Sequence, residues 1–523
     1  MAHKTTVPAE KQQPSNEPVE QATPYDPAHR KSIYEPMEHN GDIEDQNLEL
    51  AHFGHTDVAN ARRLLSRYGR DIAYVSGIGF LVWDGMRWCP DRSDLAVRPL
   101  AHRVADEIQF EARALRAAAA DREVVDALFK WRRTSENSAR VEAMIREARP
   151  YVQKSIESLD SNTFLVNASN GVTIRLGEPP EHFEPGLDLP FVTPGSPDRD
   201  DLLTRQLGVA FEQDATCPNW EKFLSEILPD TELRAFLQRW CGYLLTGSVE
   251  EQVLVICHGL GANGKSTLLE TLSFVLGDYA VGLSFASLLR DERKRGSDAS
   301  PDISRLRGTR LAVASEPDTG ARFSESTIKQ LTGGDRITAR EIYHSFVEFQ
   351  PTFKLMLSVN NRPQIRGQDE GIWRRLLMLP FERIIPPEQR DRRLPEKLKS
   401  EGSGILNWMI GGYCDWRVNG LNVPDRVRHA TEDYREHEDP VGSFLSSRTR
   451  PEPNKNIRAT ELYGEYSQWC HENGESTYNQ KAFGRIMSER GIERVKKGVY
   501  FYRGIELIKT PPDTDDSPSD GEI

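Results

Sequence analysis

Residues 259–266 read Gly-Leu-Gly-Ala-Asn-Gly-Lys-Ser, which fits the spacing G-x-x-x-x-G-K-[ST] of a phosphate-binding loop. Glycines at the first and sixth positions let the backbone curl until several N–H groups face phosphate oxygens. Lys265 is expected to reach the β- and γ-phosphates of ATP, and the Ser266 hydroxyl to ligate Mg²⁺. The residues expected to contact the nucleotide are Gly259, Leu260, Gly261, Ala262, Asn263, Gly264, Lys265, Ser266 and Thr267.

The context of this loop supports the interpretation. The apolar stretch 253–257 before it is typical of a buried strand, and residues 267–276 after it are apolar at helical spacing. A strand, a glycine-rich loop and a helix are the order that such a motif requires. A chance glycine-rich turn is the alternative, and both flanks argue against it.

A second apolar segment, 310–316, ends in the carboxylate of Glu316. A parallel strand would bring this acid to the edge of the sheet beside the phosphates, where Glu316 would orient or deprotonate the attacking water and serve as a metal ligand. Many such strands carry an acid one position earlier, but Ser315 stands there in this chain. A direct carboxylate ligand for Mg²⁺ therefore stays open, and Asp318 is a weaker candidate.

A third apolar segment, 354–360, ends at Asn360, whose amide is expected to hydrogen-bond the γ-phosphate or the water. Its alternative is a strand-end turn, and both roles are compatible. Arg374 and Arg375 follow a short loop later. Either one fits the role of an arginine that stabilises the transition state in a neighbouring subunit, and a surface ion pair is the alternative.

The segment between the second and third strands predicts a β-hairpin, because its residues alternate in polarity on both sides of a turn at 341–345. Arg340, Tyr343 and His344 would lie near its tip. A basic and aromatic tip, with Lys329 before it, is suited to grip the backbone and the base faces of a nucleic-acid strand without reading its sequence.

Composition and charge limit the class of protein. The chain has 523 residues, of which 37% are hydrophobic, and a net charge of −13. We find no apolar run long enough to span a bilayer and no signal peptide, so a cytoplasmic protein without membrane contacts is expected. The charge is −6 over residues 1–50 and −5 over residues 511–523, which leaves the body nearly neutral. Six scattered cysteines favour reduced thiols over a zinc site or a disulfide framework.

Folded regions are expected between two disordered acidic tails. The first region begins with a helix capped at Thr56 and holds short strands around Trp83 and Trp88, whose rings are expected in the core rather than on a base-stacking surface. The expected boundaries are a tail over 1–54, a mixed α/β domain over 55–249, a nucleotide-binding core over 250–390, a helical connector over 391–440, a winged-helix-like domain over 441–509 and a tail over 510–523.

The winged-helix expectation comes from an order of three helices followed by two strands across Gly498. The second helix and the wing, the elements that face DNA in such a domain, carry a cluster of cations: Arg485, Arg490, Arg494, Lys496 and Lys497. These cations are expected to contact the phosphates of duplex DNA near a fork or origin. A solvated basic face is the alternative.

Five segments in order, GLGANGKS, LAVASE, KQLTGGDRITAR, KLMLSVNNRP and WRR, resemble the motifs of the superfamily 3 helicases. The chain is similar to the branch of phage and plasmid primase–helicase proteins related to the poxvirus helicase-primase. FLVWDGMRW resembles that family's amino-terminal helicase-associated domain, and residues 441–505 resemble its winged-helix extension. The resemblance implies an α/β fold with an AAA+-like P-loop ATPase core, a hexameric ring that hydrolyses ATP at its subunit interfaces, and single-stranded DNA drawn through the centre by hairpins.

Proteins of this kind serve the replication of phages, prophages and plasmids. Many carry a primase-polymerase domain ahead of the helicase. The residues ahead of the first expected helix look disordered, so we expect the helicase part alone, with a separate primase as a partner beside single-stranded and forked DNA. The leading hypothesis is an ATP-dependent DNA helicase. The alternative is a replication initiator that binds DNA and uses ATP as an assembly switch without unwinding.

Overall fold

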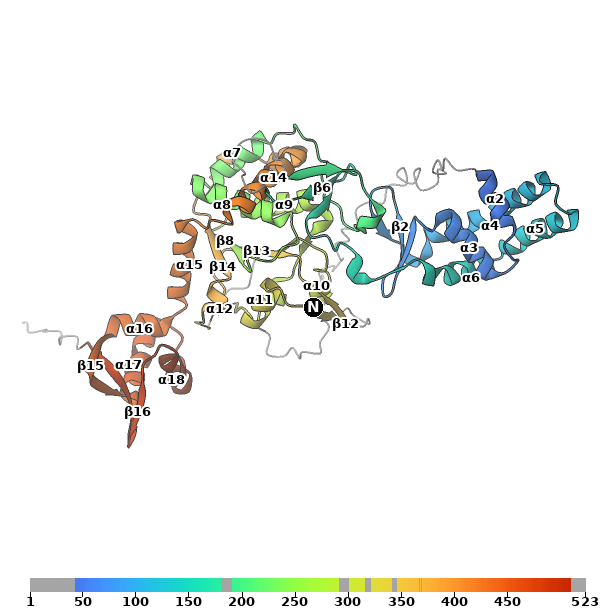
Figure 1. Ribbon diagram of the computed structural model, residues 1–523. Coiled ribbons are helices and arrows are strands. Elements are labelled where there is room, and N and C mark those ends of the chain that lie inside the picture. Colours follow the sequence, from blue (N-terminus) through green and yellow to red (C-terminus); the bar gives the residue numbers. More distant parts are fainter. Residues whose placement is uncertain are drawn as a thin grey trace, which may run out of the picture. The chain divides into compact units, whose positions relative to one another are not determined.

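The computed structural model describes residues 43–179, 191–290, 301–315, 321–340, 346–365, 367 and 369–508. The chain divides into two compact units, Met1–Gly85 with Cys89–Gln153 and Met86–Trp88 with Lys154–Ile523 (Figure 1). The domain boundaries expected from the sequence stay predictions, except that the expected disordered tail over 1–54 is wrong at its end, where Ile43–Ala51 form a helix with Leu50 buried. Glu316, Asp318, Tyr343 and His344 lie outside the described residues, as do residues 1–42 and 509–523 of the expected tails.

The first unit combines helices with a small sheet. Its helices are α2 (Ile43–Ala51), α3 (Asp57–Tyr68), α4 (Val97–Ala117), α5 (Arg122–Ser135) and α6 (Ser138–Ala148). The sheet has the order β3 (Trp88–Pro90), β2 (Gly79–Trp83), β1 (Ile72–Val75), β4 (Gln153–Lys154), and all of it except Trp88 and Lys154 belongs to this unit. The predicted cap is confirmed, because the Thr56 hydroxyl accepts a hydrogen bond from the Ala59 N–H at 3.1 Å. A buried ion pair, Arg63 Nε to Glu111 Oε2 at 2.8 Å, joins α3 to α4.

The second unit is built on a five-stranded parallel sheet in the order β14 (Leu376–Pro380), β8 (Leu254–His258), β13 (Lys354–Val359), β10 (Leu311–Ser315), β9 (Ala280–Gly282). All six residues of β13 are buried, as expected for a parallel strand covered on both faces. The three apolar segments of the sequence are thus neighbouring strands, and the expectation of an α/β fold with a parallel sheet is confirmed.

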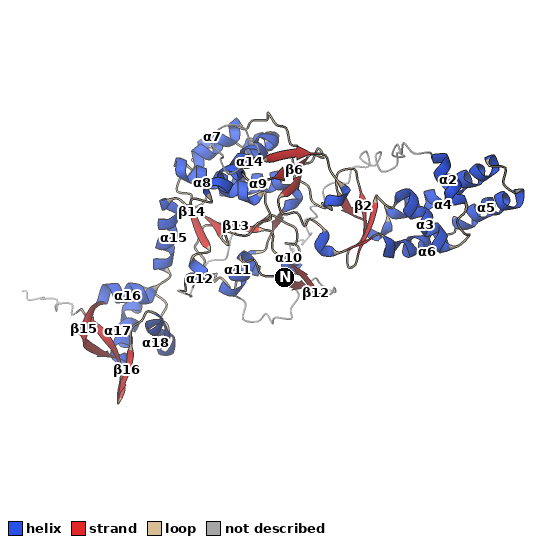
Figure 2. Ribbon diagram, in the orientation of Figure 1, coloured by secondary structure: helices blue, strands red, loops and turns tan. Residues whose placement is uncertain are grey.

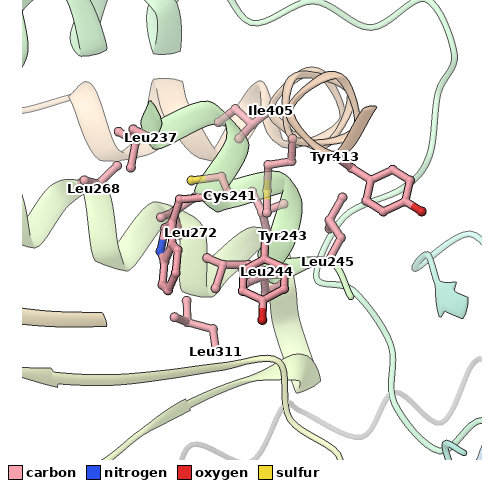
Figure 3. Close-up of a cluster of buried hydrophobic side chains, with 14 of the residues drawn as sticks. Leu237, Cys241, Tyr243, Leu244, Leu245, Leu268, Leu272, Leu311, Ile405 and Tyr413 are labelled. Carbon is pink, nitrogen blue, oxygen red and sulfur yellow. The ribbon is translucent and has the colours of Figure 1, made fainter. Parts of the chain in front are cut away.

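Alternate residues of these strands face two separate cores. Val255 and Cys257 of β8 belong to the core formed with α7 (Pro218–Ile227), α8 (Thr231–Leu244), α9 (Lys265–Leu276) and α14 (Gly402–Asn419). Figure 3 shows side chains of α8, α9 and α14 meeting in this core.

Helices α8 and α14 approach each other closely at two glycines. A Cβ atom on Gly242 would lie 1.9 Å from the Tyr413 nitrogen, and one on Gly412 would lie 2.0 Å from the Gln238 carbonyl oxygen. Any larger residue would push the helices apart. The elements before and after the sheet in sequence therefore form one packed layer over it.

Leu254 and Ile256 face the second core, which is formed with α11 (Glu325–Thr332), α12 (Glu370–Trp373), α15 (Asp425–His437) and the β11–β12 hairpin (Figure 2). β11 (Ile337–Arg340) pairs antiparallel with β12 (Phe346–Phe349). The strands of the predicted hairpin are thereby confirmed, while its tip lies outside the described residues. The other elements before residue 440 are β5 (Leu165–Asn167), β6 (Thr173–Leu176), β7 (Val192–Gly195), α10 (Pro301–Ser304) and α13 (Leu394–Ser400).

The carboxy-terminal part of the second unit has one strand more than the sequence predicted. Its elements are α16 (Pro440–Arg448), β15 (Thr449–Arg458), α17 (Ala459–Glu472), α18 (Gln480–Glu489), β16 (Arg494–Lys497) and β17 (Val499–Leu507), and its sheet has the order β15-β17-β16. The missed strand, β15, holds two prolines and mostly exposed polar residues, which is a pattern tolerated only at the edge of a sheet. Its pairing with β17 is irregular between Pro451 and Asn456.

Three further findings bear on the sequence predictions. All six cysteines are free thiols. Trp83 and Trp88 are buried, so the prediction that their rings lie in the core is confirmed. Among the described helices, none is long and apolar enough to cross a membrane.

Candidate functional site

The glycine-rich loop connects the end of β8 to the start of α9, at the carboxyl edge of the parallel sheet. Gly264 has a φ of 84° and a Cβ there would lie 2.6 Å from the Ile227 side chain of α7. A Cβ on Gly259 would lie 2.2 Å from the Phe381 carbonyl oxygen. Both positions therefore require glycine, the first for its backbone angle as well as for space.

Lys265 is the first residue of α9 and is 4% exposed. Its Nζ donates hydrogen bonds to the Gly259 carbonyl at 2.6 Å, the Asn263 Oδ1 at 3.0 Å and the Asn360 Oδ1 at 3.1 Å. Asn360 follows β13, the neighbour of β8, so the parallel sheet brings the end of the third apolar segment to the loop. Two residues predicted for the same site are thus in direct contact.

The loop is also fixed to the chain that follows β14. The Asn263 side-chain amide donates to the Phe381 carbonyl at 3.2 Å, and the Ile385 N–H donates to the Ala262 carbonyl at 2.8 Å. Ala262 has a φ of 63°, which is unusual for a residue with a side chain. These contacts hold the loop in a curled conformation.

The start of α9 offers an anion-binding surface. Ser266 is exposed, Thr267 is half-buried, and the first turn of the helix carries no acidic side chain. The first N–H groups of a helix have no carbonyl partner within it, and with the positive end of the helix dipole they favour a negatively charged ligand there. A hydroxyl, backbone donors and a lysine ammonium are the groups expected around a phosphate.

His258, the last residue of β8, adds no positive charge to this edge at neutral pH. Burial, together with the charges of Arg362 and Lys265, lowers its pKa. A group whose ordinary pKa is 6.5 is then neutral at pH 7. Burial also raises the pKa of the adjacent Cys257 thiol to about 12, so this thiol stays protonated.

Arg374 and Arg375 follow α12 and precede β14, and the structure distinguishes the two. Arg375 is half-buried and donates to the Gly371 carbonyl, and burial with the nearby charge of Arg374 lowers its pKa. Arg374 is exposed and makes no ion pair with the described residues. Arg374 is therefore the better placed of the two to reach another molecule.

Lys329 of α11 makes an ion pair with Asp369, with Nζ 2.8 Å and 3.0 Å from the two carboxylate oxygens. The pair joins α11 to the residue before α12. Its hydrogen bond lowers the pKa of Asp369. Sequence reasoning missed Asp369, although an acidic residue directly before a short helix is a signal for a helix cap.

The remaining predicted DNA contacts are dispersed. Arg340 is the last residue of β11. The side chains of Arg340 and Lys497 are not among those that the structure describes. Arg485 of α18 and Lys496 of β16 are exposed. Their contacts with DNA, and that of Lys329, stay predictions.

Two protein-family models match the chain. The model described as D5 N terminal like covers residues 61–229. A family of unknown function (DUF5906) covers residues 257–375, the stretch that contains Lys265, Asn360 and both arginines.

Curated relatives come from large DNA viruses. A protein of Acanthamoeba polyphaga mimivirus named "Putative helicase" is 30% identical over 346 residues, which are 62% of this chain and 34% of that protein. A "Putative helicase" of Frog virus 3 is 26% identical over 51% of this chain and 29% of its own length. A "Putative primase" of African swine fever virus is 22% identical over 49% of this chain and 29% of its own. The chain thus spans about a third of the length of these relatives.

A solved structure, the apo carboxy-terminal region of NrS-1, superposes with a TM-score of 0.38 and 13% identity, over 57% of this chain and 77% of that one. The family evidence rests instead on the D5-like region and on the viral relatives named above. On that evidence the chain is similar to putative helicases and primases of viruses, and its residues 61–229 match the D5-like family model.

Proposed function

We propose that this protein is an ATP-dependent DNA helicase that serves the replication of a phage, prophage or plasmid. The observation that carries the proposal is the contact between Lys265 and Asn360. It joins a glycine-rich loop to the end of the neighbouring parallel strand, the edge at which an α/β sheet binds its ligand. The similarity to viral putative helicases and primases supports a role in replication.

The groups at this edge fit ATP with Mg²⁺. The loop N–H groups and Lys265 would hold the phosphates, and the exposed Ser266 hydroxyl is available as a metal ligand. Asn360 would hydrogen-bond the γ-phosphate or the attacking water, and Glu316 is proposed as the base that accepts the water's proton and as a metal ligand. A bound Mg²⁺ would neutralise charge on the phosphate oxygens.

The exposed Arg374 supports a ring in which one subunit completes the site of the next. An arginine supplied across an interface stabilises the charge of the transition state and contributes roughly 10³–10⁵ in rate. We propose that the ring is a homo-hexamer. The β11–β12 hairpin would grip single-stranded DNA, and the carboxy-terminal region would act as a winged helix on forked DNA, with priming supplied by a separate protein.

One observation favours the alternative of an initiator that binds ATP as a switch. β10 ends at the exposed Ser315, where an acid would offer a second metal ligand. Slow hydrolysis that DNA does not stimulate would fit that alternative.

The deciding experiment measures ATP hydrolysis with and without single-stranded DNA, beside strand displacement on a forked duplex. A helicase gives DNA-stimulated hydrolysis and displacement, both lost in Lys265→Ala. ATP binding without displacement, under conditions in which the ring is assembled on the fork, would contradict the motor and favour the initiator.

A further inference from the structure

The β16–β17 hairpin carries an exposed aromatic ring close to its turn. Tyr500 is 44% exposed and Val499 is 52% exposed. The strand register places Lys496 opposite Tyr500 and Arg494 opposite Tyr502, with Gly498 at the turn at a φ of 72°. Since side chains of directly opposed residues share a face, these four side chains lie on the same face of the hairpin.

The base of this hairpin is anchored and its outer part is not. Tyr502 is buried and packs edge-on against Phe483 of α18, with ring centroids 6.3 Å apart. Tyr500, two residues closer to the turn than Tyr502, lies outside the core. Packing therefore accounts for Tyr502 but not for an aromatic side chain at position 500.

Two cations surround the exposed ring. The Arg494 guanidinium carbon lies 3.8 Å from the Tyr500 ring centroid, and the Lys496 Nζ lies 5.9 Å from it. Neither cation makes an ion pair with the residues that the structure describes. Arg490 and Arg485 of the α18 region differ, because they pair with Asp439 and Glu489 respectively. The arginine beside the Tyr500 ring thus differs from Arg485 and Arg490, whose charges are paired.

We propose that the hairpin tip binds an unpaired nucleotide, with Tyr500 stacked on its base and with Arg494 and Lys496 on the adjacent phosphates. Arg494 lies over the ring, and Tyr500 is still 44% exposed, so we infer that part of the ring can stack on a base. A base inside intact duplex is already stacked on both sides, so only an unpaired base can use this surface. This inference rests on the proposed function and changes the preferred ligand of the carboxy-terminal region from plain duplex to the unpaired arm of a fork.

The test uses the full chain and forked DNA with 2-aminopurine in the unpaired arm next to the duplex. A matched probe carries the same base inside the duplex. Stacking on Tyr500 should change the fluorescence of the first probe and not of the second. Tyr500→Ala should weaken binding of the fork about tenfold and abolish the change, whereas Tyr500→Phe, which keeps the ring, should preserve both. Val499→Ala, at an equally exposed neighbour, is the control and should bind the fork as the wild type does.

Three results would overturn the inference: fork binding by Tyr500→Ala equal to the wild type, a fluorescence change that persists in that variant, or no fork binding by the wild type at low salt. If fork binding does not depend on Tyr500, the hairpin tip is instead a surface for a protein partner. ATP hydrolysis, measured in parallel, separates the two ideas. A Tyr500-dependent signal without hydrolysis contradicts the motor alone, and DNA-stimulated hydrolysis with an insensitive Tyr500→Ala contradicts the stacking site alone.

Discussion

Lys265 lies where the loop, helix α9 and strand β13 meet. Three neutral oxygens, from Gly259, Asn263 and Asn360, accept hydrogen bonds from its ammonium. These bonds orient the side chain before any nucleotide arrives, so little rotamer entropy remains to be lost on binding. A nucleotide must then compete for the same three protons.

Replacing Lys265 by Ala should lower the rate of ATP hydrolysis at least about 100-fold, because a positive donor aimed at the developing charge is lost. Circular dichroism should show an unchanged fold. The matched control is Lys397→Ala, which removes a lysine of the same unit that is half-exposed and paired with Asp391. Hydrolysis by Lys265→Ala at the wild-type rate would show that the loop does not bind the reacting phosphates.

Asn360→Asp keeps the size of the side chain and adds a charge next to the Lys265 ammonium. The new carboxylate should hold the lysine in an ion pair and repel the phosphates. Nucleotide affinity, measured by titration calorimetry, should fall below that of Asn360→Ala, which removes the hydrogen bond without adding a charge. Equal affinities in the two variants would place Asn360 away from the phosphates.

At the scale of elements, Gly264 directly precedes α9. Both the loop motif and the packing against α7 require a glycine at this position. Gly264→Ala would place a methyl group 2.6 Å from Ile227 at a φ of 84°. We expect it to lower the free energy of unfolding by about 1–3 kcal/mol. Gly261→Ala is the matched control, since a Cβ there meets nothing within 4 Å. Urea unfolding of both variants tests this, and equal stabilities would mean that the loop relaxes freely.

The Lys329–Asp369 pair joins α11 to α12, the helix that precedes Arg374. Because the folded pKa of Asp369 is lowered, its contribution is fully present above the ordinary carboxyl pKa of 3.8 and is lost as the pH falls through the lower, folded value. Both side chains are partly exposed, so the contribution is below about 1 kcal/mol.

Asp369→Asn should therefore be slightly less stable than the wild type from pH 8 to pH 5, and the difference should shrink only below about pH 4. Urea unfolding across this range measures it. The exchanged pair, Lys329→Asp with Asp369→Lys, should recover part of the loss. If the difference in stability between Asp369→Asn and the wild type disappears already between pH 7 and pH 6, a titrating group other than Asp369 is responsible.

The sequence predicted elements well where one physical pattern dominates. Long apolar runs made the strands of the parallel sheet recognisable, and the rule that parallel strands end at one edge predicted that Asn360 would lie near the loop. β15 could not be predicted in this way, because edge strands tolerate proline and polar residues. The Lys329–Asp369 ion pair could not be predicted from the sequence either, since surface charges forty positions apart carry no periodic signal.

At the scale of the whole molecule, the proposed ring predicts that two inactive variants complement each other. Lys265→Ala lacks the phosphate-binding lysine, and the double variant Arg374→Ala, Arg375→Ala lacks the arginines. In equal mixtures about a quarter of the interfaces would combine an intact loop with an intact arginine of the neighbouring subunit. We expect DNA-stimulated hydrolysis near that fraction of the wild-type rate.

Mass spectrometry of differently tagged protomers must establish that the rings are mixed. Each variant alone is the control and should stay inactive. Mixed rings without any recovered hydrolysis would mean that the arginines act within their own subunit or have a structural role.

The close crossing of α8 and α14 limits how this protein can be divided in evolution or in the laboratory. One helix precedes the glycine-rich loop in the gene and the other follows the last strand of the sheet, yet their backbones touch at Gly242 and Gly412. A fragment restricted to the loop and the strands would expose the apolar side chains that this helical layer covers. A fragment that contains a folded nucleotide-binding core must therefore retain the chain from α7 through α14. Recombination events that leave this core intact are expected to have their breakpoints before α7 or after α14.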